Sequence, residues 1–186
     1  MSEGIAVKPL DRFRSYLLLL ARIHLGAQVR KKFDASDIVQ QTLLEAHRDQ
    51  AQFRGHTVPE QAAWLRQILA RNLVNAVRDL GRAKRDIARE RSFELALDAS
   101  ASRIEGWLAA EHSSPSLQAE RHERTVRIAE ALAELLDAQR EAIVLRHWHG
   151  RSLSEIGEEL NVSTTAVAGL LQRGLKNLRK RLQDLR

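Results

Sequence analysis

A leucine-rich seam near the end of the chain limits the possible folds more than any other pattern. It lies within SLSEIGEELNVSTTAVAGLLQRGLKNLRKRL. Its apolar residues recur at steps of three and four, the period of one helical face. They are Val167, Leu171, Leu175, Leu178 and Leu182. Ser152 and Glu155 match a capping box at the start of a shorter helix before this one. The stretch Asn161-Val162-Ser163 makes the turn between the two helices. This pattern predicts a helix-turn-helix, which commonly places its second helix in the major groove of DNA.

The outer face of the second helix is polar and basic, as expected for a helix that meets a phosphate backbone and base edges. The residues predicted to contact DNA are Ser163, Thr164, Thr165, Ala168, Gln172, Arg173, Lys176 and Arg179.

Charge is unevenly distributed along the chain, although the net value is only +6. Lys and Arg are in excess over residues 64–91 and again over residues 172–186, whereas residues 92–150 are acidic. Two basic islands on amphipathic helices favour binding to a polyanion, because Lys and Arg release counterions from phosphates.

The remaining sequence also has helical periodicity and few prolines, so we expect an all-α protein. The first helix is predicted over residues 10–27. Asp34 caps the next, and Thr57 and Glu60 form a capping box for a third that ends near Leu80. Residues 92–121 lose the long-range period, and they are rich in serine and acidic residues. They predict an acidic flexible linker between helical domains at 1–91 and 122–186, with short helices around 93–97 and 104–110.

Three smaller predictions concern individual residues. Asp137 is expected to cap a helix that ends at Gly150 in a left-handed conformation. Trp64 is expected to lie on the core-facing side of the third helix, and the alternative is that it stacks on a nucleic-acid base.

Two exposed faces of the N-terminal helices have an unusual composition. The helix after Asp34 carries Asp37, Gln40, Gln41 and Leu44 on one stripe, which is either a solvated face or a docking surface. The third helix carries Arg71, Asn75, Arg78 and Arg82 at i, i+4, i+7 and i+11. Such a row of basic and amide groups can follow a nucleic-acid backbone and hydrogen-bond to bases.

Several classes of function are disfavoured. The chain has no cysteine, no glycine-rich phosphate loop and no HExxH motif. His147 and His149 point to different sides of a helix, so they do not form a metal site. We therefore expect no metal, no cofactor and no enzymatic activity. The longest apolar run, residues 16–21, is too short for a membrane span or a signal peptide, which predicts a cytoplasmic protein.

Three segments, in this order, resemble bacterial RNA polymerase sigma factors of the extracytoplasmic-function class of the sigma-70 family. They are FDASDIVQQTLLEAHRD, WLRQILARNLVNAVRD and LLDAQREAIVLRHWHGRSLSEIGEELNVSTTAVAGLLQRGLKNLRKRL. The resemblance implies a region 2-like helical bundle that binds core polymerase and melts the −10 element. It also implies a region 4-like helix-turn-helix that reads the −35 element. Core RNA polymerase and promoter DNA are the implied partners, and an anti-sigma factor is common in the family.

The resemblance also assigns roles by position. It places the contact with polymerase at Asp37, Gln40, Gln41 and Leu44. It places the contacts with the −10 element at Phe53, Arg54, Gly55, Arg71, Asn72, Asn75, Arg78 and Arg82, with the first three holding a flipped base. The acidic linker resembles the segment that threads the RNA exit path of the polymerase.

One part of the recognition helix departs from the family pattern. Where relatives carry Lys and Arg, this chain has Ala168 and Leu170, with Gly169 between them. This departure leaves open a polymerase-binding adaptor whose DNA helix has decayed. A stand-alone helix-turn-helix regulator that binds duplex DNA without polymerase is the other alternative.

Overall fold

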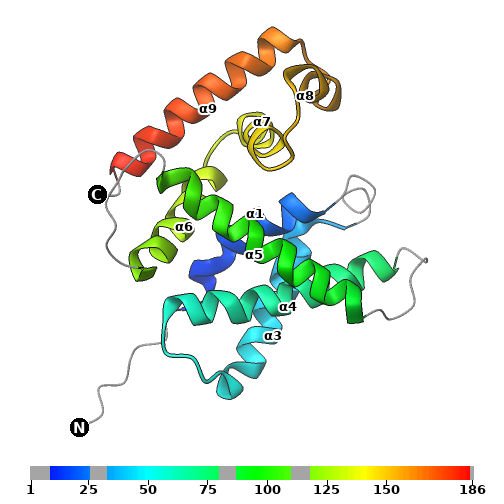
Figure 1. The fold of residues 1–186 in the computed structure, drawn as a ribbon, viewed down its shortest axis with the longest axis vertical. Coiled ribbons are helices and arrows are strands. Elements are labelled where there is room, and N and C mark those ends of the chain that lie inside the picture. The colour runs from blue at the N-terminus through cyan, green and yellow to red at the C-terminus, as the bar shows by residue number, and fades with distance from the viewer. Residues whose placement is uncertain (1–8, 26–32, 80–86, 110–117, 185–186) are drawn as a thin grey trace. The chain divides into compact units, whose positions relative to one another are not determined.

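The computed structural model describes residues 9–25, 33–79, 87–109 and 118–184, and every regular element within these ranges is a helix (Figure 1). The predicted all-α class is therefore confirmed. The chain divides into two compact units, Met1–Val126 and Arg127–Arg186. The N-terminal unit thus extends well beyond residue 91, the predicted end of the first domain.

The N-terminal unit is a bundle of short and long helices. In chain order these are the 3₁₀ helix η1 (Leu10–Phe13), α1 (Arg14–His24), α3 (Ala35–Asp49), the 3₁₀ helix η2 (Gln50–Gln52), α4 (Val58–Asp79) and α5 (Ile87–Ala109). A further helix, α6 (Gln118–Ala133), crosses from this unit into the next. The packing is centred on α4, which lies against α3 and α5 and also contacts α1.

One apolar stripe of each helix forms the core of this unit. The largest fully buried side chains are Leu10, Phe13, Tyr16, Leu17, Leu20, Leu65, Leu69, Leu73, Leu97 and Ile104. Burying these stripes supplies most of the stability of helices that would be marginal in isolation.

Both helix starts predicted in this unit are confirmed. The Asp34 carboxylate accepts a hydrogen bond from the backbone N–H of Ser36 at 2.9 Å. The Thr57 hydroxyl accepts from the Glu60 N–H at 3.3 Å, and Glu60 accepts in return from the Thr57 N–H at 3.0 Å. The first helix differs from the prediction: it opens as η1, and α1 ends at His24. Residues 26 and 27, the predicted end of that helix, lie outside the described residues.

The flexible linker predicted over residues 92–121 is not confirmed for its first part. Residues 92–109 belong to α5, a continuous helix that packs on α4 and α1. Leu97, Ala101 and Ile104 are buried at steps of four and three. Two polar contacts add to this packing: Arg66 donates to Asp98 at 2.6 Å, and the His24 ring lies 3.0 Å from the Ser100 hydroxyl.

The prediction is wrong here because serine and acidic residues, which usually indicate a solvated chain, are part of a packed helix in this segment. In the structure, Ser100 is buried in the bundle and Asp98 pairs with a cation of α4. The apolar stripe of α5 is short, and small residues interrupt it, so it gives only a weak helical period. Tertiary partners on α1 and α4 decide that this segment is ordered.

The C-terminal unit contains the end of α6, α7 (Asp137–His147), α8 (Leu153–Leu160) and α9 (Thr164–Asp184). Ile128 and Leu132 of α6 are fully buried. A second cluster joins the last three helices through Ala142, Leu145, Ile156 and Val167. The leucine-rich seam predicted for α9 does face the core of this unit. Val167 and Leu178 are buried, and the other residues of the seam are half-buried.

Asp137 does not cap α7 as predicted. The N-cap residue is Leu136, whose side chain makes no capping hydrogen bond, and Asp137 is the first residue of the helix. Its carboxylate instead forms an ion pair with Arg140 one turn later. Arg140 is buried and also donates to the carbonyl oxygens of Ala133 and Leu135. The arginine thereby ties the carboxylate to the preceding turn.

The helix-turn-helix is present as predicted. Ser152 and Glu155 form the full capping box of α8, and the Ser163 hydroxyl accepts from the Ala166 N–H at 3.2 Å at the start of α9. Gly150 has the predicted positive φ of +64°, and Asn161 in the turn has a φ of +54°. A Cβ on Gly157 would lie 2.7 Å from the carbonyl oxygen of Val162, so this close approach of the turn to α8 requires glycine.

Candidate polymerase and nucleic-acid interfaces

The stripe predicted to bind polymerase is exposed on α3. The side chains of Asp37, Gln40 and Gln41 are exposed, and that of Leu44 keeps 57% of its surface accessible. The opposite side of α3 is buried, with Ile38, Val39 and Leu43 among its core residues. An exposed leucine beside an acid and two amides gives this face the mixed composition of a protein interface.

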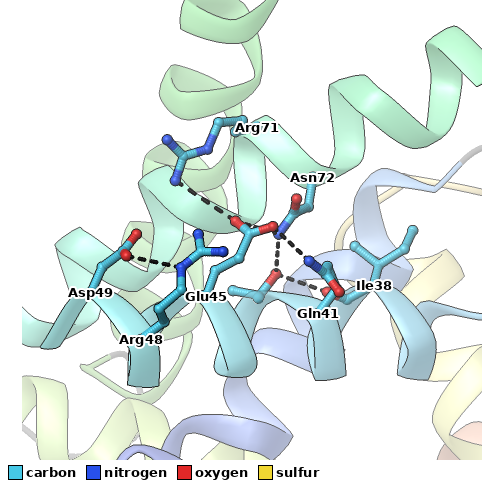
Figure 2. Close-up of polar contacts among 8 residues, drawn as sticks. Ile38, Gln41, Glu45, Arg48, Asp49, Arg71 and Asn72 are labelled. Carbon is cyan, nitrogen blue, oxygen red and sulfur yellow. Dashed lines mark hydrogen bonds and ion pairs between the residues drawn. The ribbon is translucent and has the colours of Figure 1, made fainter.

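A polar cluster joins α3 to α4 through Glu45, one turn after Gln41 (Figure 2). The amide of Gln41 donates to one carboxylate oxygen of Glu45 at 2.8 Å. The amide of Asn72 lies 3.4 Å from the other oxygen, and the Arg71 guanidinium lies 3.8 Å from that same oxygen. Glu45 thus connects a residue of the predicted polymerase face with two residues predicted to meet DNA.

The loop before α4 forms an open pocket of about 460 Å³. Its lining residues are Gln52, Phe53, Arg54, Gly55, Glu60 and Trp64. The rings of Phe53 and Trp64 are stacked, with their centroids 4.9 Å apart and an interplanar angle of 26°. Trp64 is half-buried: it packs on Phe53 and lines the pocket, so the prediction of a core position is met only in part. Stacking of Trp64 on a nucleic-acid base stays a prediction.

Two local features fix the shape of this loop. Gly55 lies beside the Phe53 ring, and a Cβ there would approach ring atoms to 2.3 and 2.8 Å. Glu60 receives hydrogen bonds from the backbone N–H of His56, the hydroxyl of Thr57 and the backbone N–H of Thr57. These three donors hold the pKa of the Glu60 carboxyl below its usual value. The ionised carboxylate therefore fastens the loop to the first turn of α4.

The α4 residues predicted to contact DNA are not all exposed. Arg71 and Arg78 are exposed, and Asn75 is half-buried. Asn72 differs from them because it is only 8% exposed and donates to the Thr42 hydroxyl at 3.1 Å. Its side chain connects α3 and α4 rather than presenting a free surface. Arg82 lies outside the described residues.

The predicted DNA face of α9 is exposed along its length. The exposed residues are Ser163, Thr164, Thr165, Ala168, Gln172, Arg173, Lys176 and Arg179. The guanidinium of Arg173 folds back toward Gly169, where a Cβ would lie 3.0 Å from its nearest nitrogen. The charge of Arg173 therefore lies along the turn that contains Ala168 and Leu170. Leu170 is half-buried against the core cluster of this unit.

Within the described ranges, no group of three or more His, Cys, Asp or Glu residues is placed to hold a metal ion. No helix in those ranges has the length and apolar character needed to cross a bilayer.

Comparison with known proteins identifies the family. Residues 125–178, from the middle of α6 into α9, match the family described as Sigma-70, region 4. The chain is also 34% identical over 164 residues to the RNA polymerase sigma factor CarQ of Myxococcus xanthus, and the match covers 87% of this chain and 82% of that protein. The chain belongs to the sigma-70 family. It is a sigma factor similar to the extracytoplasmic-function class, and it directs transcription initiation with core RNA polymerase on promoter DNA. The alternative of a stand-alone regulator is not favoured, because the likeness to a sigma factor extends over both units of the chain.

Sequence reasoning missed two carboxylates of this sigma factor, Glu45 and Glu60, as parts of the site. The spacing of Gln41 and Glu45 at i and i+4 was a signal for the first, because residues four apart are neighbours on a helix. Glu60 was identified only as a cap, and its place in the wall of the pocket depends on the path of the loop. The contacts of Glu45 with Asn72 and Arg71 across to α4 could not be predicted from one helix alone.

Proposed function

We propose that this sigma factor binds core RNA polymerase through the exposed stripe of α3 formed by Asp37, Gln40, Gln41 and Leu44. The composition of the stripe supports this proposal. Leu44 offers exposed apolar surface beside these polar groups. Asp37 and the two amides can fix the register of a partner helix by charge and hydrogen bonds.

The −10 element is captured at the pocket beside α4, and this pocket is the single observation that carries the proposal. Its Phe53–Trp64 stack offers an aromatic surface to an unstacked base, and Arg54 adds a cation at its rim. Flipping a base out of the duplex costs a few kcal/mol, which stacking and backbone contacts offset.

Arg71 and Arg78 then hold the phosphates of the melted strand, with Asn75 beside them. Asn72 contributes indirectly, by holding α4 to α3.

The −35 element is read by α9. Thr164, Thr165 and Gln172 can hydrogen-bond to base edges in the major groove, and Lys176 and Arg179 reach phosphates. Arg173 supplies a positive charge along the turn where relatives carry their own cations, since its guanidinium lies beside Gly169. This placement favours a DNA-reading helix over the decayed helix of an adaptor.

The remaining assignments follow from the role of a sigma factor. Bond formation stays with the polymerase, so the chain itself is not an enzyme and needs no cofactor. It works in the cytoplasm, where polymerase and DNA are found. An anti-sigma factor that covers the α3 stripe would keep it inactive.

The experiment that tests the proposal is reconstitution with core polymerase. The purified protein is mixed with core enzyme, the complex is isolated, and transcripts from fragmented genomic DNA are sequenced. We expect defined start sites, and we expect Asp37→Arg to weaken the complex roughly tenfold or more by reversing a charge at the interface.

Asp49→Arg provides the matched control, because Asp49 lies at the end of the same helix and outside the stripe. It should transcribe as the wild type does. Normal core binding by Asp37→Arg would refute the assignment of the α3 stripe, and binding without defined starts would favour an adaptor.

A further inference from the structure

Glu45 occupies a position between the two surfaces of the N-terminal unit that the proposed function assigns to polymerase and to DNA. It lies on α3, directly after the polymerase stripe, and its carboxylate faces α4 (Figure 2). Its side chain is only 17% exposed, whereas that of its partner Arg71 is 49% exposed. A largely covered anion therefore lies beside an accessible cation that is proposed to bind phosphate.

The partners of Glu45 do not hold it equally. Gln41 donates to one oxygen at 2.8 Å, and Asn72 lies 3.4 Å from the other. Asn72 is itself fixed, because its amide also donates to Thr42 at 3.1 Å. Arg71 is 3.8 Å from the carboxylate, which is within range of an ion pair and beyond that of a hydrogen bond.

Because of this difference, Arg71 can move away while the Glu45 carboxylate keeps its hydrogen bonds. The two amide donors remain on Glu45 when the guanidinium swings away, so no buried acceptor is left without a hydrogen bond. The carboxylate is the fixed member of the pair and Arg71 is the exchangeable one.

A carboxylate and a phosphate compete for the same guanidinium. Both accept hydrogen bonds from its planar N–H groups, and a DNA phosphate that approaches Arg71 also meets the negative charge of Glu45. Binding of single-stranded DNA must therefore replace one anion with another, which lowers the net gain from the Arg71 contact.

We propose that Glu45 is a positioning residue that occupies Arg71 until a phosphate of the melted strand displaces it, and that it thereby weakens binding of single-stranded DNA. The proposal rests on the proposed function, in which Arg71 contacts that strand. By lowering affinity for arbitrary single strands, Glu45 makes stable binding depend on the other contacts, including base capture in the pocket beside α4.

The test is a double-mutant cycle on Glu45→Gln and Arg71→Ala in the complex with core polymerase. The probe is a fluorescent single strand of mixed sequence, about 15 nucleotides long, a length comparable to the sites that single-strand-binding proteins cover. Affinity is measured by fluorescence anisotropy at low salt, and core binding of each variant is measured in parallel. Glutamine keeps the size and helix propensity of glutamate, so the fold is expected to be retained.

We expect Arg71→Ala to weaken binding and Glu45→Gln to tighten it about two- to fivefold, the range for a partly exposed ion pair. The gain should shrink as salt is raised and should vanish when Arg71 is already alanine. Structural damage at Glu45 would lower affinity rather than raise it. Asp49→Asn is the matched control, since it removes the same charge from α3 at a residue that pairs with Arg48, and it should change little.

The outcomes separate the two proposals. If Arg71→Ala binds the strand as tightly as the wild type, the role of α4 in the proposed function is wrong. If Arg71→Ala weakens binding but Glu45→Gln does not tighten it, only the inference about Glu45 is wrong. The inference about Glu45 would also be wrong if Glu45→Gln tightened binding equally with and without Arg71, or if Asp49→Asn tightened it as well. The tightening would then come from the loss of a general repulsion between negative charge and DNA.

Discussion

Replacing Leu97 by alanine tests whether α5 belongs to the core of the N-terminal unit. Leu97 has no accessible surface and lies one turn before Ala101, which is also buried. Leu95, two residues earlier on the same helix, keeps 64% of its surface accessible. The two substitutions remove the same atoms from the same helix, so the change in helix propensity is the same for both.

The expected magnitudes follow from burial. Removing a fully buried leucine side chain costs about 2–5 kcal/mol of unfolding free energy, because transfer free energy is lost and a cavity remains. Removing an exposed one changes stability by about 0.5 kcal/mol or less. With a urea dependence of roughly 2 kcal/mol per molar, Leu97→Ala should move the midpoint down by about 1–2.5 M.

The measurement is urea unfolding of the full chain, followed by circular dichroism. Because the chain has two units, the transition that Leu97→Ala shifts should be the one that a core variant of α4, Leu69→Ala, also shifts. If Leu97→Ala and Leu95→Ala unfold at the same midpoint as the wild type, α5 is not part of the core and its packing on α4 is wrong.

Two further predictions concern the loop and the helix-turn-helix. Gly55→Ala should displace the Phe53 ring, because the new Cβ would overlap it, and should slow promoter opening several-fold while a pre-melted template is still transcribed; unchanged opening of duplex promoters would contradict this. The Glu155 pKa is lowered from 4.5 to about 2, first by the Ser152 backbone N–H, then by its side chain and by Arg151. The charged carboxylate therefore stabilises the fold fully above pH 4.5 and loses this effect as pH falls toward 2. Wild type should be more stable than Glu155→Gln near neutral pH, and the difference in melting temperature should shrink over that window; a difference that is independent of pH would refute it.

Part of the candidate site could be predicted from one helix at a time. Exposure of Asp37 and Leu44 follows from the period of α3, since its buried positions are occupied by apolar residues. The outer face of α9 follows from its seam in the same way. The position of Asn72 could not be predicted so, because its partner Thr42 lies 30 residues away on another helix.

The local features of this sigma factor follow from its amino-acid sequence. The caps at Asp34, Thr57 and Ser152, the positive φ at Gly150 and the boundaries of the helix-turn-helix depend on hydrogen bonds and sterics within a few residues, which residue type alone sets.

Features that depend on distant partners follow instead from the packing of the helices. Residues 92–109 carry a weak helical period, and they are ordered because α1 and α4 offer an apolar surface and the cation of Arg66. Asp137 is of a residue type that commonly caps helices, but its carboxylate pairs with the buried Arg140 instead. Glu45 links α3 to Arg71 and Asn72 because the two helices pack side by side, and no local pattern encodes that meeting.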